Sequence, residues 1–152
     1  MKIRLLGLLS ALVVGVSTLV AAPAQAATPA VQLTKIYYDS PGVDNRTNKS
    51  LNAEWVRLTN RTSKTINLKS WTLRDKAGHV YRFSSEYRLK PGRHAYVHTG
   101  RGTNGKPDYR HLYWNSGNYI WNNTGDTAYL RNPSGKLIDS CSWQGKGSYT
   151  YC

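Results

Sequence analysis

Apolar and polar residues alternate in short runs along this chain, and the stretch from Glu54 to Phe83 shows the pattern well. Two polar stretches, 60–65 and 75–78, separate three apolar-rich segments, Glu54–Thr59, Ile66–Leu73 and His79–Phe83. Alternation over four to eight residues between turn-forming residues is typical of β-strands. The pattern predicts consecutive antiparallel strands on which the core of the fold is built.

The period of two also assigns faces to the first of these segments. Val56 and Leu58 fall on the predicted core side, and Trp55 and Arg57 fall on the opposite side. Glu54 then lies at the buried edge, where a carboxyl group requires a hydrogen-bond partner.

The second segment, Ile66–Leu73, changes phase. Ile66 and Leu68 share one face, whereas Trp71 and Leu73 belong to the other. A bend or a bulge is therefore expected at Lys69-Ser70.

Further strands are predicted on both sides of this stretch, at Val31–Tyr38, His94–Thr99, Ala128–Arg131 and Leu137–Trp143. Imperfect alternation in the first of them allows a bulge. Segments 39–51 and 100–110 are rich in turn-forming residues and are predicted to be surface loops. No sustained helical period occurs after residue 26, so the chain is expected to be an all-β sandwich or barrel.

The first 26 residues have the pattern of a secretory signal peptide. Lys2 and Arg4 precede the apolar run Leu5–Val20, and Ala24-Gln25-Ala26 fits a cleavage site. The alternative is a membrane anchor, but the run is shorter than the roughly 20 residues that a spanning helix needs. We therefore expect an exported protein that consists of residues 27–152 and has no transmembrane segment after cleavage.

The chain is strongly basic, with 21 Lys and Arg against 8 Asp and Glu and a net charge of +13. Loss of Lys2 and Arg4 with the signal peptide would leave +11. Such an excess attracts polyanions such as nucleic acid, cell-wall polymers or an anionic membrane. The alternative is a charge that only keeps an exported domain soluble, since the basic residues are dispersed rather than clustered.

The two cysteines, Cys141 and Cys152, suggest a disulfide in an exported chain. It would tie the last predicted strand to the C-terminal residue. Two free thiols, or a reactive one, are the alternative; no histidine neighbours either cysteine in the sequence.

Four motifs follow one another in a recognisable order: EWVRLTN, INLKSWTLRDKAGHVYRF, LKPGRHAYVHTGRG and YIWNNTGDTAYLRNPSGKLIDS. Together they resemble the lamin tail domain family, over about Val31–Trp143. The resemblance implies an immunoglobulin-like β-sandwich, with a domain at 27–152 and its core at about 31–143.

The chain is especially similar to stand-alone exported lamin-tail proteins of bacteria. In nuclear lamins the domain is an interaction module without catalytic residues, and in bacteria it often accompanies exported hydrolases and nucleases. The tail that ends at Cys152 is not explained by the family pattern.

Motifs for catalysis or cofactors are weak. The segment Gly100–Gly105 matches G-x-G-x-x-G, but Lys106-Pro107-Asp108 follows it instead of a helix start. His94 and His98 would lie about 13 Å apart on a strand, too far to share one zinc ion. The sequence has no G-x-S-x-G motif and no suggestive carboxylate pair. We expect no enzyme activity, no cofactor, no metal and no small-molecule substrate.

Basic and aromatic residues interleave after Thr99. The candidate polyanion-binding residues are Arg101, Lys106, Tyr109, Arg110, His111 and Trp114. Aromatic rings stack on bases or sugars, and Arg and Lys contact phosphates. The alternative is that Trp114 belongs to the core and that the arginines lie in a solvated loop.

The leading hypothesis is a secreted, non-enzymatic binding or scaffold module outside the cell, in solution or associated with the cell wall. Its partner would be a polyanion or another secreted protein. The alternatives are binding of extracellular nucleic acid or a cell-wall polyanion through the basic aromatic loop, and a role as accessory to an exported nuclease or hydrolase.

Overall fold

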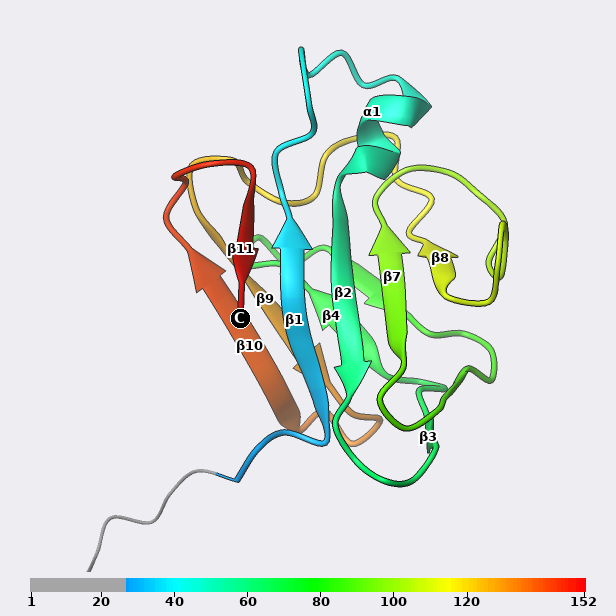
Figure 1. Ribbon diagram of the computed structural model, residues 1–152. Helices are drawn as coiled ribbons and strands as arrows, with labels where there is room; N and C mark the ends of the chain where they lie inside the picture. Colours follow the sequence, from blue (N-terminus) through cyan, green and yellow to red (C-terminus); the bar gives the residue numbers. More distant parts are fainter. Residues whose placement is uncertain (1–26) are drawn as a thin grey trace, which may run out of the picture.

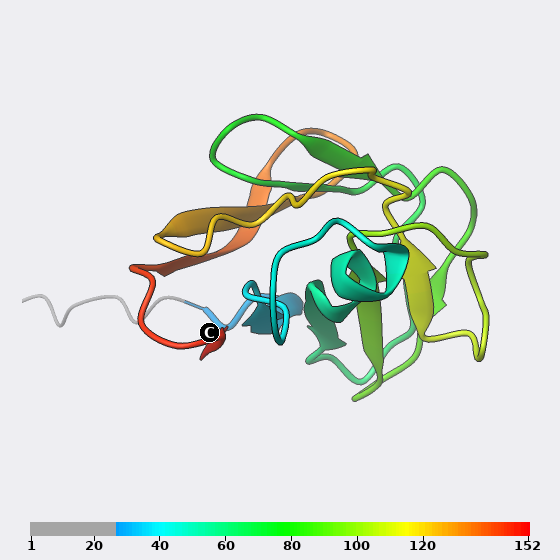
Figure 2. The ribbon, with the colours of Figure 1, turned by 90° about the horizontal axis from the view of Figure 1, so that it is seen from above.

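Two β-sheets stack face to face in the computed structural model, which describes residues 27–152 (Figures 1 and 2). The five-stranded sheet has the order β11-β1-β2-β7-β8 and consists of β1 (Val31–Tyr37), β2 (Trp55–Asn60), β7 (His94–His98), β8 (His111–Tyr113) and β11 (Tyr149–Tyr151). The four-stranded sheet has the order β10-β9-β4-β5 and consists of β4 (Thr72–Arg74), β5 (Val80–Arg82), β9 (Asp126–Arg131) and β10 (Leu137–Trp143). A short ribbon joins β3 (Ile66–Asn67) to β6 (Arg88–Leu89), and the helix α1 (Asn48–Ala53) lies at one end of the sandwich. The prediction of an all-β sandwich is confirmed.

The core lies between the two sheets and follows the alternation of the strands. Val56 and Leu58 of β2 are completely buried, and so are Leu73 of β4 and Leu130 of β9 from the facing sheet. Their strand neighbours point outward, because successive side chains of a strand lie on opposite faces. The predicted core side of β2 is therefore confirmed.

The strands of the stretch from Glu54 to Phe83 do not form one flat meander. β2 pairs with β1 and β7, whereas β4 and β5 form a hairpin in the other sheet. The bend expected at Lys69-Ser70 is present. Ser70 has a positive φ of 66°, and the chain turns there from the ribbon strand β3 to β4.

Two elements appear that the sequence pattern did not predict. α1 begins inside segment 39–51; its N-cap is Thr47, whose side chain accepts a hydrogen bond from the backbone N–H of Ser50. The C-terminal tail forms β11, which pairs with β1 so that Tyr151 lies opposite Lys35. The bulge allowed in the first strand is present, as a register shift between Leu33 and Lys35.

The predicted disulfide is confirmed. Cys141 of β10 is bonded to Cys152, so β11 is linked covalently to the four-stranded sheet while it pairs with the five-stranded one. The described residues contain no free cysteine.

The predicted signal peptide, residues 1–26, lies outside the described residues. From residue 27 onward, no helix is both long and apolar enough to cross a membrane.

Asn60, the last residue of β2, holds the following turn together. Its buried side-chain amide donates to the carbonyl oxygens of Lys64 and Leu89, both at 2.8 Å, and its Oδ1 accepts from the backbone N–H of Thr62 at 2.9 Å. Asn60→Ala should lower the free energy of unfolding by about 2 kcal/mol, because the buried carbonyl group of Leu89 loses its donor and the turn loses two further hydrogen bonds. Urea unfolding followed by circular dichroism measures this.

The matched control for Asn60→Ala is Asn118→Ala. Asn118 is exposed, and within residues 27–152 its side-chain amide makes no hydrogen bond to protein. Its replacement should change stability by less than about 0.5 kcal/mol. Equal effects of the two substitutions would show that the Asn60 bonds contribute nothing specific.

Candidate functional site

Glu54 is fully buried at the junction of α1 and β2, and it connects this junction to the segment that precedes β9. Its two carboxylate oxygens accept hydrogen bonds from the backbone N–H groups of Ile120, at 3.2 Å, and Trp121, at 2.9 Å. Burial raises the pKa of Glu54 to about 8, against the opposing effect of these bonds and of Thr99. These two hydrogen bonds give Glu54 a structural role, because they hold the segment before β9 against the start of β2.

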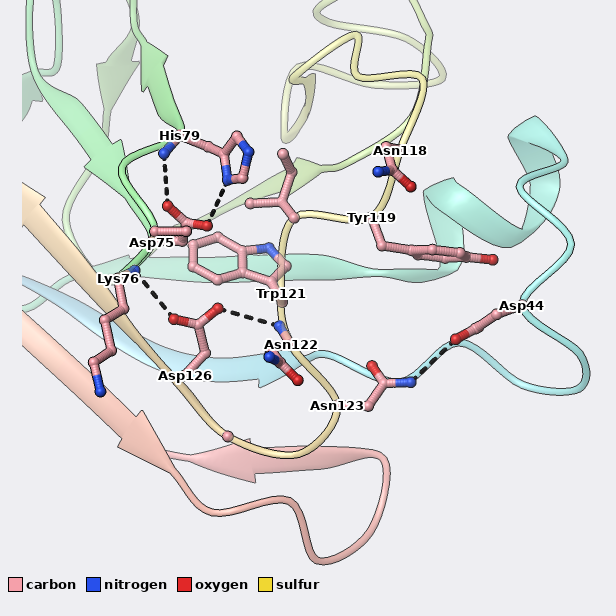
Figure 3. A pocket seen from close by; sticks show the side chains of 13 residues that line it. Asp44, Asp75, Lys76, His79, Asn118, Tyr119, Trp121, Asn122, Asn123 and Asp126 are labelled. Carbon is pink, nitrogen blue, oxygen red and sulfur yellow. Dashed lines mark hydrogen bonds and ion pairs between the residues drawn. The ribbon is translucent and has the colours of Figure 1, made fainter.

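A cleft of about 760 Å³ lies between the β4–β5 hairpin turn and the segment that precedes β9 (Figure 3). It holds the carboxylates of Asp44, Asp75 and Asp126, and all three accept hydrogen bonds from the protein. Asp44 accepts from the side chains of Ser40 and Asn123, each at 3.2 Å.

Asp75 accepts hydrogen bonds from the backbone N–H and from the ring Nδ1 of His79, at 2.7 and 2.6 Å. Asp126 accepts from the backbone N–H groups of Lys76 and Asn122, each at 3.1 Å. This arrangement offers no free carboxylate pair for acid–base chemistry.

The six candidate polyanion-binding residues have different contacts in the structure. The backbone of Arg101 is bound by Asn48 and Asn52 of α1. Tyr109 lines a second cleft together with Tyr87.

The remaining candidates differ in their surroundings as well. Trp114 is half-buried and packs edge to face on the core residue Trp121. Lys106 is exposed. Arg110 and His111 come together beside β7, where the backbone carbonyl of Arg110 accepts from the N–H of Tyr96 and the ring of His111 stacks on that of Tyr96. Binding of polyanions by the six residues as a set stays a prediction.

The glycines of the G-x-G-x-x-G segment serve close packing. A Cβ atom on Gly100 would lie 2.6 Å from the side-chain oxygen of Asn52, and one on Gly102 would lie 2.5 Å from the ring of Tyr113. No helix follows this segment, so the phosphate-binding arrangement of a dinucleotide fold is not built here.

A continuous row of aromatic side chains crosses the outer face of the five-stranded sheet. The ribbon in Figure 1 shows this sheet from the front. We call it the aromatic row; in spatial order it consists of Tyr151, Tyr149, Tyr37, Trp55, Tyr96, His111, His98 and Tyr113. All five strands contribute to it, and every ring is exposed or half-buried.

Neighbouring rings of the aromatic row contact each other throughout. Ring centroids of successive members lie between 5.1 and 5.7 Å apart. The planes of His98 and His111 are within 19° of parallel, whereas Trp55 and Tyr96 meet edge to face at 78°. Pairs of Tyr and Trp rings stabilise one another by about 0.5–1.5 kcal/mol each, which favours a fixed arrangement of the rings in that part of the row.

Cations lie among and beside these rings. The ammonium group of Lys35 is 3.7 Å from the ring centroid of Tyr149 and 5.0 Å from that of Tyr151. The side chain of Arg57 donates to the hydroxyl of Thr34. In the part of the chain that the structure describes, Lys35 and Arg57 form no ion pair with a carboxylate.

The histidines of β7 lie on the same face. Burial, and after it the charges of nearby arginines, lowers the pKa of His94; these arginines are Arg57, Arg61, Arg110 and Arg93. Burial also lowers the pKa of His98, whose Nδ1 lies 2.8 Å from the carbonyl oxygen of Asn52. Among residues 27–152, no group of three His, Cys, Asp or Glu side chains could hold a metal ion.

The sequence places the members of the aromatic row strand by strand but does not bring the strands together. Alternation puts Trp55 on the outer side of β2, and Tyr96 on the same side as His98 of β7. The parallel pairing of β7 with β8 sets His111 next to Tyr96, and β11 adds its two tyrosines at the opposite edge. A signal was present in the Tyr-Thr-Tyr pattern of the tail, which has the alternation of a strand.

The sequence matches the family model of the Lamin Tail Domain over residues 24–145. Among curated protein sequences, none matches this chain significantly. The family consists of immunoglobulin-like, non-catalytic domains, in agreement with the sandwich described above. Glu54 and Asn60, the two ends of the first motif, have structural roles, as do Asp75 and Asp126 of the later ones. The chain belongs to the lamin tail domain family.

Proposed function

We propose that this lamin tail domain acts outside the cell as a non-enzymatic binding module for polyanions, and that the outer face of its five-stranded sheet is the binding surface. The gathering of positive charge on this face supports the proposal. Arg57, Arg61 and Arg93 lie near His94, and Lys35 lies among the rings of the aromatic row.

The charge on this face is largely uncompensated. The guanidinium groups of Arg57 and Arg61 donate to neutral oxygens, of Thr34 and Gln32. Asp108 is the carboxylate beside the face, and it is paired with Arg110 at 2.8 Å. An anionic polymer can therefore be bound without displacement of an existing ion pair.

The salt dependence of binding tests this proposal. If the four cations Lys35, Arg57, Arg61 and Arg93 neutralise phosphates, affinity for a flexible polyanion should fall about 50-fold between 50 and 200 mM salt. Fluorescence anisotropy with labelled DNA and with a glycerol-phosphate wall polymer measures it.

A matched pair of charge reversals locates the surface. Arg57→Glu with Arg61→Glu should weaken binding strongly. Arg74→Glu with Arg82→Glu changes the net charge equally but lies on β4 and β5, at exposed positions of the other sheet. Equal losses in both double variants, or no binding by the unaltered protein, would contradict the proposal.

A further inference from the structure

The aromatic row adds a second kind of recognition to this charged face. Rings that project from a sheet surface, with cations beside them, are the arrangement on which RNA- and DNA-binding sheets stack the bases of a single strand. These rings cannot be buried in the core, because they point away from it. The residues on the other side of each strand face the sandwich interior.

The row is long enough to contact more than one base. Its rings come from all five strands, from Tyr151 on β11 to Tyr113 on β8. Two of its members are largely exposed, Tyr149 at 46% and Tyr151 at 66%. The most exposed rings therefore lie at the β11 edge, where Lys35 also lies.

Charge complementarity restricts the class of ligand. The outward-pointing residues of the five strands include no Asp or Glu. A glycerol-phosphate wall polymer without sugar substituents supplies phosphates but neither bases nor sugars, so it would contact the cations and not the rings. A duplex buries the faces of its bases in its own stack. A single strand offers both exposed bases and phosphates.

We infer that the outer face of the five-stranded sheet binds single-stranded nucleic acid, whose bases stack on the aromatic row while its phosphates contact Lys35 and Arg57. This inference rests on the proposed function, because it specifies which polyanion the charged face accepts. It gives the rings a role in binding, through stacking on bases, that electrostatic attraction to phosphates does not require.

Fluorescence titration of residues 27–152 tests the inference with four probes: a single strand of about 12 nucleotides, which is within the site size of single-strand binders, an abasic strand with the same number of phosphates, the corresponding duplex, and a glycerol-phosphate polymer. The single strand should bind at least about fivefold more tightly than the abasic strand, since each stacked base contributes about 1–3 kcal/mol. It should also quench the fluorescence of Trp55.

Variants separate stacking from charge. Trp55→Leu and, independently, Tyr151→Ala should weaken binding of the single strand at least about fivefold and leave binding of the abasic strand unchanged. Tyr151 lies at the C-terminal edge, so its replacement keeps the fold even if that of Trp55 does not. Tyr129→Ala is the control, because Tyr129 is a half-buried tyrosine of β9, outside the aromatic row.

Each outcome decides between the two proposals. Equal affinity for the single strand and the abasic strand, or tighter binding of the duplex or of the wall polymer, would overturn the stacking inference and leave polyanion binding intact. Absence of binding to all four probes would overturn both.

Discussion

Replacement of Glu54 by alanine should lower the free energy of unfolding by about 4 kcal/mol, the largest effect expected of a single substitution here. The backbone N–H groups of Ile120 and Trp121 are bound by this carboxyl group, and each would be left buried without an acceptor. An unsatisfied buried donor costs about 1–3 kcal/mol. Denaturant unfolding at pH 6 measures the loss, and a change below about 1 kcal/mol would show that water replaces the carboxyl group without strain.

Glu54 should also make stability depend on pH in an unusual direction. Its pKa is about 8 in the folded protein, against 4.5 for an exposed glutamate. Between these values the folded state keeps a proton that the unfolded state has lost. Stability should therefore fall as the pH rises from about 5 to 8, by up to about 1.4 kcal/mol per pH unit.

Glu54→Gln is the control for this pH dependence. Glutamine keeps the size of the side chain and one acceptor but cannot ionise. Its curve of stability against pH should lack the Glu54 contribution, while the histidines contribute equally to both proteins. The difference between the two curves isolates Glu54, and parallel curves from pH 5 to 8 would mean that Glu54 keeps an ordinary pKa when folded.

The alternation of the sequence was sufficient to predict an all-β sandwich or barrel and the faces of its main strands, and the family resemblance selected the sandwich. Val56 and Leu58 could be assigned to the core because a period of two is a local property of the chain. The burial of Glu54 followed from the same phase. The break at Lys69-Ser70 was also readable, since a phase change has to be absorbed by the backbone, here at the positive φ of Ser70.

Elements that depend on distant contacts were missed. α1 has six residues, fewer than two turns, so no helical period can be detected in it. Its formation depends on the Thr47 cap and on the burial of Leu51. β11 has three residues and exists through its pairing with β1 and the disulfide to β10.

The candidate surface illustrates the same limit. The predicted loop residues were grouped because they are close in sequence, but Arg101, Tyr109 and Trp114 have different neighbours in the structure. The aromatic row joins residues as distant in sequence as Tyr37 and Tyr149. Register and sheet order create it, and neither can be read from the composition of one strand.

Removal of the disulfide should have the second largest effect. Replacement of Cys141 and Cys152 together by alanine should lower the free energy of unfolding by about 3 kcal/mol, because the unfolded chain regains the entropy of a short closed loop. The separation of the two cysteines is 11 residues. Denaturant unfolding of the oxidised protein and of the double variant measures the difference.

Removal of the disulfide should also loosen β11 locally, in addition to lowering the stability of the whole domain. β11 is anchored by its pairing with β1 and by this bond, so hydrogen exchange at Tyr149–Tyr151 should accelerate while the β9–β10 pair stays protected. Reduction of the unaltered protein should reproduce both effects, and the double variant should not respond to reductant. If reduction leaves exchange at β11 unchanged, pairing with β1 alone holds the strand. In that case the two tyrosines at its edge of the aromatic row keep their place without the covalent link.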